Sequence, residues 1–204
     1  MTDDSGRGRF IVFEGGEGSG KSTQAERLGD RLGAVLTRQP GGTPLGAELR
    51  ELLLEADLGM SDRAEALLMA ADRAQHAQEL IRPALENGRH VVCDRYTGSS
   101  VAYQGHGRGL DPAEIAGLSA WATDGLEPDL VVLLRVDRAT SEGRTGMPRD
   151  RIEAAGDGFH ERVQAGFDAQ AEADPGRWVV LDGSGTVAEV AALVDQAVSD
   201  RLRL

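Results

Sequence analysis

A glycine-rich stretch with one lysine has the residue types and spacing of a phosphate-binding loop. Residues 15–22 read Gly-Gly-Glu-Gly-Ser-Gly-Lys-Ser, which fits the pattern G-x-x-x-x-G-K-[ST]. Glycine allows backbone conformations in which successive N–H groups turn inward around an anion. The Lys21 ammonium can then reach the β and γ phosphates, and the Ser22 hydroxyl can bind Mg²⁺. The stretch therefore predicts a site for a nucleoside triphosphate and Mg²⁺.

The residues around this loop supply the context that the motif requires. Residues 10–13, Phe-Ile-Val-Phe, predict a short buried strand, and a helical pattern starts at Thr23. Lys21 is the only lysine of the chain, at a position that suits a compact ammonium better than a planar guanidinium. The residues expected to contact the triphosphate form one run: Gly15, Gly16, Glu17, Gly18, Ser19, Gly20, Lys21, Ser22 and Thr23.

A second apolar run ends in an acid. Residues 91–94 read Val-Val-Cys-Asp, as expected of the strand beside a phosphate loop. Asp94 is then placed to orient Mg²⁺ through a water molecule, so Ser22 and Asp94 are the candidate metal-site residues. The alternative is that the Asp94 carboxylate only caps the turn after the strand.

Absent motifs narrow the class of nucleotide-binding protein. The Asn-Lys-x-Asp motif of GTPases cannot exist here, because Asn87 and Lys21 are the only residues of their kinds. A large multidomain ATPase does not fit 204 residues. A compact kinase of a small acceptor remains, and it needs a second anion site and a basic lid. The candidates are Arg50, Arg73 and Arg95 for the acceptor, and Arg144, Arg149 and Arg151 for a lid at about residues 143–151, where Gly146 and Pro148 interrupt the helical pattern.

Length and composition limit the number of domains, the kinds of partner and the cellular location. A chain of 204 residues with 40% hydrophobic content predicts one domain, here residues 9–204, after a loose polar tail over residues 1–8. The net charge of −12 disfavours a nucleic-acid surface. No apolar run is long enough to span a membrane, and the N-terminus does not resemble a signal peptide. A single cysteine, Cys93, excludes an intrachain disulfide. We expect a cytoplasmic protein.

Short β-branched strands alternate with helices along the chain. This alternation predicts an α/β fold in which a five-stranded parallel sheet has helices on both faces, with ligands at the carboxyl ends of the strands. Strands are expected at 10–13, 34–37, 89–94, 129–136 and 177–181. Helices are expected at 20–32, 45–54, 62–87 with an interruption near Pro83, 112–125, 137–144, 151–173 and 186–202, and residues 96–109 are expected to form a polar loop.

Several stretches together resemble the bacterial thymidylate kinase family over about residues 9–200. The phosphate loop is shared with many families, whereas Asp-Arg-Tyr-Thr-Gly-Ser-Ser-Val-Ala-Tyr-Gln-Gly at 94–105 and Thr-Arg-Gln-Pro-Gly-Gly-Thr-Pro-Leu-Gly at 37–46 are far more discriminating. Residues 13–24, 71–76 and 150–153 also match. The resemblance implies a P-loop NTPase-type three-layer sandwich with a short lid, a homodimer, ATP as phosphoryl donor with Mg²⁺, and dTMP as acceptor.

The resemblance also implies roles for individual residues. Arg95 and Arg50 would bind the acceptor phosphate, and Arg73 would reach a thymine carbonyl. Tyr103 would lie against the deoxyribose, where a 2′-hydroxyl would clash, and Glu17 would contact the 3′-hydroxyl or a water near Mg²⁺. Backbone at 183–186 would hold adenine. The implied substrate-binding residues are Glu17, Arg50, Met69, Arg73, Arg95, Ser99, Ser100, Tyr103 and Gln104, and the implied catalytic residues are Lys21, Arg95, Arg144, Arg149 and Arg151.

The chain departs from the family pattern in the base pocket. Many relatives have Glu at the position of Gln39 and Asp at the position of Gly98, and they usually stack Phe on thymine where this chain has Met69. Two alternatives therefore stay open. One is a kinase of another nucleoside monophosphate, which the pocket around Met69 and Arg73 would distinguish. The other is a non-catalytic nucleotide-binding protein, against which the intact set of Lys21, Ser22, Asp94 and Arg95 argues.

Overall fold

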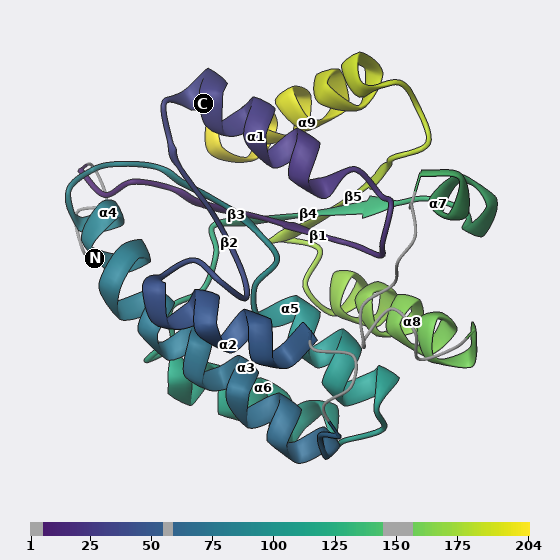
Figure 1. Cartoon of the computed structure of the whole chain (residues 1–204). Coiled ribbons are helices and arrows are strands. Elements are labelled where there is room, and N and C mark those ends of the chain that lie inside the picture. The colour runs from purple at the N-terminus through teal and green to yellow at the C-terminus, as the bar shows by residue number, and fades with distance from the viewer. Residues whose placement is uncertain (1–5, 55–58, 145–156) are drawn as a thin grey trace.

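The computed structural model describes residues 6–54, 59–144 and 157–204, and a parallel sheet lies at its centre (Figure 1). The strands are β1 (Phe10–Glu14), β2 (Val35–Arg38), β3 (Val91–Asp94), β4 (Leu130–Arg135) and β5 (Trp178–Asp182). Their order is β2-β3-β1-β4-β5, and every neighbouring pair is parallel. β1 lies at the switch point, because β2 and β3 lie on one side of it and the chain then crosses to β4 and β5 on the other side. The predicted five-stranded parallel sheet is confirmed.

Helices cover both faces of the sheet, as all-parallel sheets require. α1 (Lys21–Leu32) and α9 (Val187–Leu202) lie on one face, where Leu28 and Val194 pack against Ile11 and Phe13 of β1. The intervening residues of β1, Phe10 and Val12, point to the opposite face. That face carries α2 (Pro44–Leu54), α3 (Asp62–His76), α4 (Arg82–Glu86), α5 (Thr97–Ser100), α6 (Pro112–Ala122) and α8 (Asp157–Ala173). The short helix α7 (Arg138–Arg144) follows β4 and lies beyond the carboxyl ends of the strands (Figure 1).

Two segments differ from the sequence-based expectation. Residues 96–109 were expected to form a polar loop, but they fold as α5 followed by a π-helical segment, Val101–Gly107. Tertiary packing outweighs the low helix propensity of glycine there: the ring of Phe159 in α8 lies where a Cβ at Gly107 would be. The helix expected at 62–87 instead comprises α3, a π-helical segment at Ala77–Ile81, and α4, which begins just before Pro83.

Three further expectations concern the N-terminal tail, the lid and membrane-spanning helices. The Gly8 amide donates to the Leu85 carbonyl at 2.9 Å, and Arg7 pairs with Asp129 at 3.2 Å, so the loose tail expected over residues 1–8 does not include Arg7 and Gly8. Most of the lid expected at 143–151 lies outside the described residues. Within the described part of the chain, no helix is both long and apolar enough to cross a lipid bilayer.

Candidate active site

The phosphate loop joins the carboxyl end of β1 to the start of α1. Gly15 has φ 141°, and a Cβ there would lie 2.4 Å from the Leu134 carbonyl oxygen, so the turn out of β1 leaves no room for a side chain. Gly20 is left-handed, with φ 89°, and precedes the first helical residue, Lys21. The first turn of α1 contains no acidic residue, which leaves its unpaired N–H groups and positive end free to bind an anion.

Lys21 is buried inside this loop. Its Nζ donates to the Gly16 carbonyl at 2.6 Å and to Ser19 Oγ at 3.3 Å. Burial, and then the nearby positive charge of Arg95, lower the pKa of the Lys21 ammonium to about 8, although the carboxylates of Asp94 and Glu17 oppose the shift. An incoming polyphosphate would supply the missing negative charge and keep this ammonium protonated.

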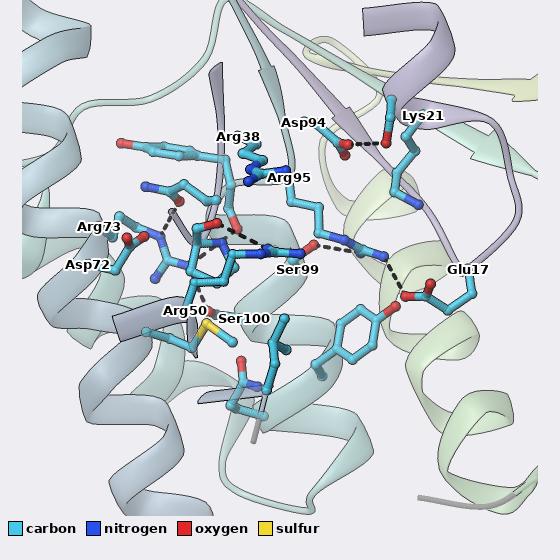
Figure 2. Close-up of a pocket in the computed structure, with 18 of the residues that line it drawn as sticks. Glu17, Lys21, Arg38, Arg50, Asp72, Arg73, Asp94, Arg95, Ser99 and Ser100 are labelled. Atoms are coloured by element: carbon cyan, nitrogen blue, oxygen red, sulfur yellow. Dashed lines mark hydrogen bonds and ion pairs between the residues drawn. The ribbon is translucent and has the colours of Figure 1, made fainter. Parts of the chain in front are cut away.

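Ser22 and Asp94 lie together across the β1–β3 boundary. The Ser22 hydroxyl donates to Asp94 Oδ2 at 2.5 Å (Figure 2), while the buried Oδ1 has no hydrogen-bond partner among the residues described. Hydroxyl and carboxylate oxygens are hard donors of the kind that Mg²⁺ takes, and Mg²⁺ usually keeps several waters. A buried carboxylate oxygen without a partner therefore fits a hydrated Mg²⁺ at this position.

Arg95 follows directly and points to the other side. Its backbone is left-handed, with φ 69°, and its guanidinium donates to the Gly15 carbonyl at 3.0 Å, to Ser99 Oγ at 3.1 Å and to Glu17 Oε1 at 3.0 Å. The guanidinium also lies 5.1 Å from the centre of the Tyr103 ring. Burial alone lowers the pKa of Arg95, but Tyr103 and the carboxylates around it raise it overall. A positive charge is thus fixed between the phosphate loop and the helices below the sheet.

Glu14, which we did not predict as a site residue, holds the backbone beside Arg95. Oε1 of this fully buried carboxylate accepts from the backbone amides of Tyr96 and Ser99, each at 2.9 Å, and Oε2 accepts from the Ser99 hydroxyl at 2.5 Å. Burial raises its pKa, although these hydrogen bonds and the charge of Arg95 oppose the shift. Its place at the last residue of β1, next to the loop, is the signal that could have identified it.

Arg73 lies at the opposite end of the same cavity and is almost fully buried. It donates to Gln39 Oε1 at 3.1 Å, to Ser119 Oγ at 3.2 Å, to Ser100 Oγ at 2.7 Å and to the Tyr96 carbonyl at 3.4 Å. Burial lowers the pKa of Arg73. These acceptors fix the plane of the guanidinium and leave one of its five N–H groups without an acceptor among the residues described.

The loop after β2 is held by buried side chains of α3. Asp72 Oδ1 accepts from the Gly41 amide at 3.0 Å, and His76 Nε2 lies 2.7 Å from the Thr37 hydroxyl. A Cβ at Gly42 would lie 2.4 Å from His76 Nε2, so a glycine is required where the loop crosses α3. Burial, and then the charge of Arg73, lower the pKa of His76 to about 4. A neutral imidazole thus supports the loop.

One cavity of about 470 Å³ connects these groups (Figure 2). Arg38 of β2, Arg50 of α2, Arg73 of α3 and Arg95 after β3 reach into it from different elements. The structure thus brings together most of the predicted site: Glu17, Gly18, Gly20, Lys21, Ser22, Thr23, Arg50, Met69, Arg73, Asp94, Arg95, Ser99, Ser100, Tyr103, Gln104 and Arg144. Lining residues that the sequence did not single out include Arg38, Pro40, Leu54, Asp72 and Tyr96.

The lid residues are only partly described. Arg144 ends α7, and its guanidinium donates to the carbonyls of Gly183 at 2.8 Å, Ser184 at 3.1 Å and Gly185 at 3.2 Å. It therefore holds the loop after β5, where backbone contacts to adenine were expected. Arg149 and Arg151 lie outside the described residues.

Comparison with known proteins decides the family. A model of the thymidylate kinase family matches residues 13–194. The chain belongs to the thymidylate kinase family. The curated thymidylate kinase of Leifsonia xyli subsp. xyli is 53% identical over 193 residues, which cover 91% of each chain. That of Cutibacterium acnes is 48% identical over 201 residues, covering 96% of this chain and 98% of its own. The crystal structure of the thymidylate kinase from Ehrlichia chaffeensis superposes with a TM-score of 0.78 at 33% identity, over 95% of this chain and 99% of that one.

Membership of the thymidylate kinase family agrees with the arrangement of the cavity. One end has the glycine-rich loop with Lys21, and the other has buried hydrogen-bonding side chains around Arg73. The fold and the enzyme class predicted from the sequence, a P-loop phosphotransferase, are therefore confirmed.

Proposed function

We propose that this site transfers the γ-phosphoryl group of ATP to dTMP, giving ADP and dTDP. The observation that carries the proposal is the single cavity that Lys21 and the arginines Arg50, Arg73 and Arg95 share. A phosphate-binding loop opens into the same space as the buried Arg73 and the half-buried Arg50 and Arg95, which suits two anions held end to end. Family membership supports the choice of a nucleoside monophosphate as the acceptor.

The donor half is the phosphate loop. Its backbone amides and Lys21 would hold the β and γ phosphates of ATP. Mg²⁺, held by Ser22 and through water by Asp94, would neutralise charge on those phosphates. The loop at 183–185, fixed by Arg144, would contact adenine through its backbone.

The acceptor half would bind the 5′-phosphate of dTMP with Arg95 and Arg50. A phosphate dianion is already a nucleophile, so no general base is needed. One of its oxygens would form the new bond to the γ phosphorus while the bond to the β–γ bridging oxygen breaks, and the electron pair leaves with ADP. Arg95 also contacts Glu17 of the loop, so it lies where charge shared between the two phosphates would develop. Positioning and charge neutralisation then supply the catalysis.

The base and sugar would lie between α3 and the Val101–Gly107 segment. Arg73 would donate its free N–H to a thymine carbonyl, with Met69 against the ring and Gln104 at its edge. Ser99 and Ser100 are committed to Glu14 and Arg73 in the structure, so they would shape the pocket by fixing these groups. Tyr103, buried beside Arg95, would face the deoxyribose.

The lid would supply charge that the phosphate loop lacks. Some relatives carry Arg at the position of Gly18, and this chain has no cation inside the loop besides Lys21. Arginines placed over the transferring group can change rates by about 10³–10⁵-fold. We assign this role to the lid at 143–151, where Arg144 and Arg149 are the candidates; Arg144 is also engaged with backbone carbonyls. Arg151 would hold the base of the lid.

We also propose a cytoplasmic homodimer that binds no nucleic acid. Apolar side chains are exposed on the outer surface of the helices below the sheet: Leu45 and Leu52 of α2, Leu67 of α3, and Trp121 of α6, which is 81% exposed. A second copy of the chain that covers them would bury apolar area. The net charge of −12 opposes contact with nucleic acid or an anionic membrane.

A coupled assay of ADP release with a panel of monophosphates tests the function. We expect dTMP to be used well, dUMP less well, and UMP, AMP and GMP hardly at all. For dUMP, loss of the 5-methyl contact should weaken transition-state binding by about 1 kcal/mol or slightly more. For the ribonucleotides, the 2′-hydroxyl should clash with Tyr103. A panel in which AMP or CMP is preferred over dTMP would contradict the acceptor assignment. No ADP release with any monophosphate would favour a non-catalytic nucleotide-binding protein.

A further inference from the structure

A buried carboxylate stands behind the edge of the pocket where the base would lie. Glu65 of α3 is fully buried, and its Oε1 accepts from Nε2 of Gln104 at 2.8 Å. Gln104 lines the cavity, whereas Glu65 lies behind it. A ligand in the cavity would therefore meet the Gln104 amide, and Glu65 would act only through it.

Glu65 has a cation to keep it ionised. The Arg108 guanidinium donates to Glu65 Oε2 at 3.0 Å and lies 4.8 Å from the centre of the Phe159 ring. Asp62, at the start of the same helix, is a second and more distant partner of Arg108, at 3.7 Å. A buried carboxylate without such a partner would be costly. The pair with Arg108 maintains a full negative charge directly behind Gln104.

That charge determines which way the Gln104 amide faces. A carboxylate can only accept hydrogen bonds, so the NH₂ group of Gln104 must turn toward Glu65. The opposite orientation would place the amide oxygen against the carboxylate. Gln104 Oε1 therefore faces away from Glu65, and it has no hydrogen-bond partner among the described residues. Because Gln104 lines the cavity, this orientation makes its amide oxygen the atom available to accept a hydrogen bond there.

We propose that Glu65 is a positioning residue for base selection: by fixing the Gln104 amide, it makes the pocket accept a base with a ring N–H and reject one with a ring nitrogen acceptor. This inference rests on the proposed function, because it assumes that the base of a nucleoside monophosphate lies beside Gln104. Thymine and uracil carry an N–H at position 3, whereas cytosine has a lone pair there and an amino group at position 4. A lone pair facing Gln104 Oε1 would be repelled and would leave a buried acceptor unsatisfied.

The test compares two acceptors that differ only at this edge, dTMP and 5-methyl-dCMP. Both keep the methyl group and the deoxyribose, so contacts to Met69 and Tyr103 cancel. In the parent we expect kcat/KM to favour dTMP by about 10³-fold or more, as for a site built to bond one donor. In Glu65→Gln the Gln104 amide is free to rotate. The preference should then fall by about tenfold or more, with KM rising for dTMP and falling for 5-methyl-dCMP.

Two controls separate positioning from a loss of structure. Glu79→Gln makes the same change at an exposed acid in the Ala77–Ile81 segment, where the partner is Gln75, and should leave both KM values unchanged. Glu65→Asp keeps the charge and should retain more of the preference than Glu65→Gln. It also provides the test if the Gln variant does not fold. Loosened packing without a change in amide orientation would raise both KM values alike.

The outcomes distinguish the inference from the function on which it rests. If the parent does not phosphorylate dTMP, the proposed function fails. If the parent uses dTMP but Glu65→Gln keeps the preference within twofold, the function stands and the role of Glu65 is wrong. The same holds if Glu65→Asp loses the preference as fully as Glu65→Gln does.

Discussion

The two ends of the cavity are built in opposite ways. The phosphate loop is one unbroken stretch of chain that presents mainly backbone N–H groups, so its shape depends on the conformations of residues such as Gly15 and Gly20. The acceptor end is assembled from β2, α2, α3, α5 and the Val101–Gly107 segment, and it works through side chains such as Arg73. A backbone site recognises the phosphates that all nucleoside triphosphates share, whereas a side-chain site can recognise one base.

The difference extends to what supports each end. Around the loop, the partners of Lys21 are Gly16 and Ser19 in the same turn. At the acceptor end, side chains are held by residues far away in the sequence: Arg73, for example, donates hydrogen bonds to Gln39 and Ser119. We therefore expect changes in the loop to reduce the rate for every acceptor alike, and changes at the acceptor end to alter the choice of acceptor.

The largest effect is expected at Lys21. Lys21→Ala should lower kcat by about 10²–10³-fold, because it removes a cation that stabilises charge on the transferring phosphoryl group. The ratio of kcat/KM for dTMP to that for dUMP should stay within about twofold of the parent, since the acceptor end is untouched. Steady-state assays at saturating ATP would measure both quantities, and a changed ratio would contradict the separation of the two ends.

The lid is expected to behave as part of the donor end. At least one of Arg149→Ala and Arg144→Ala should lower kcat by about 10²-fold with no change in the choice of acceptor, as for a contact made mainly in the transition state. Arg144→Ala should also raise the KM for ATP, because Arg144 binds the carbonyls of Gly183 and Ser184. Single-turnover rates that stay within a few-fold of the parent for Arg144, Arg149 and Arg151 variants would show that the lid does not supply this charge.

The buried acceptor end should make the protein sensitive to acid through His76. The pKa of His76 is about 4 in the folded protein, against about 6.5 ordinarily. The unfolded chain therefore binds the proton first as the pH falls, so folding stability declines from about pH 6.5 and levels off below about pH 4. Between about pH 6.5 and pH 4, the free energy of unfolding should fall by about 1–3 kcal/mol.

Urea unfolding at several pH values measures this slope. His76→Asn has no proton to bind at that position, so its slope between about pH 6.5 and pH 4 should be shallower than that of the parent. His160→Asn alters a partly exposed histidine of α8 and serves as the matched control. Equal slopes in the parent and His76→Asn would show that His76 does not couple folding to acid.

The smallest effect is expected at Met69, whose side chain lines the cavity. Met69→Ala should raise the KM for dTMP several-fold, because a methionine that covers the base contributes on the order of 2 kcal/mol of apolar contact at most. Met69→Phe should be tolerated and lower that KM. The KM for ATP should not change in either variant. A Met69→Ala variant that loses thermal stability but keeps its KM would mark Met69 as helix core alone.

The contrast between the two ends also explains what the sequence could predict. The phosphate loop and the strands are local patterns, so a short stretch such as 15–22 carries nearly all of the information needed. Glu14, Glu65, Asp72 and His76 were not predicted as site residues, because each works through a partner that only the fold brings near. The Glu65–Gln104 contact, for example, spans 39 residues. The 96–109 segment was misjudged for the same reason, since α8 and not local propensity makes it helical.

The junction between the two ends limits how far the chemistry can proceed. Asp94 is the last residue of β3 and Arg95 follows it, and their Cα atoms are held about 3.8 Å apart by one peptide unit. In the proposed roles, one serves the donor's metal and the other the acceptor's phosphate. The strand fixes this spacing, so an acceptor longer by one phosphate would carry its terminal oxygen past the point of attack. The protein should therefore release dTDP as an end product and leave the third phosphate to another enzyme.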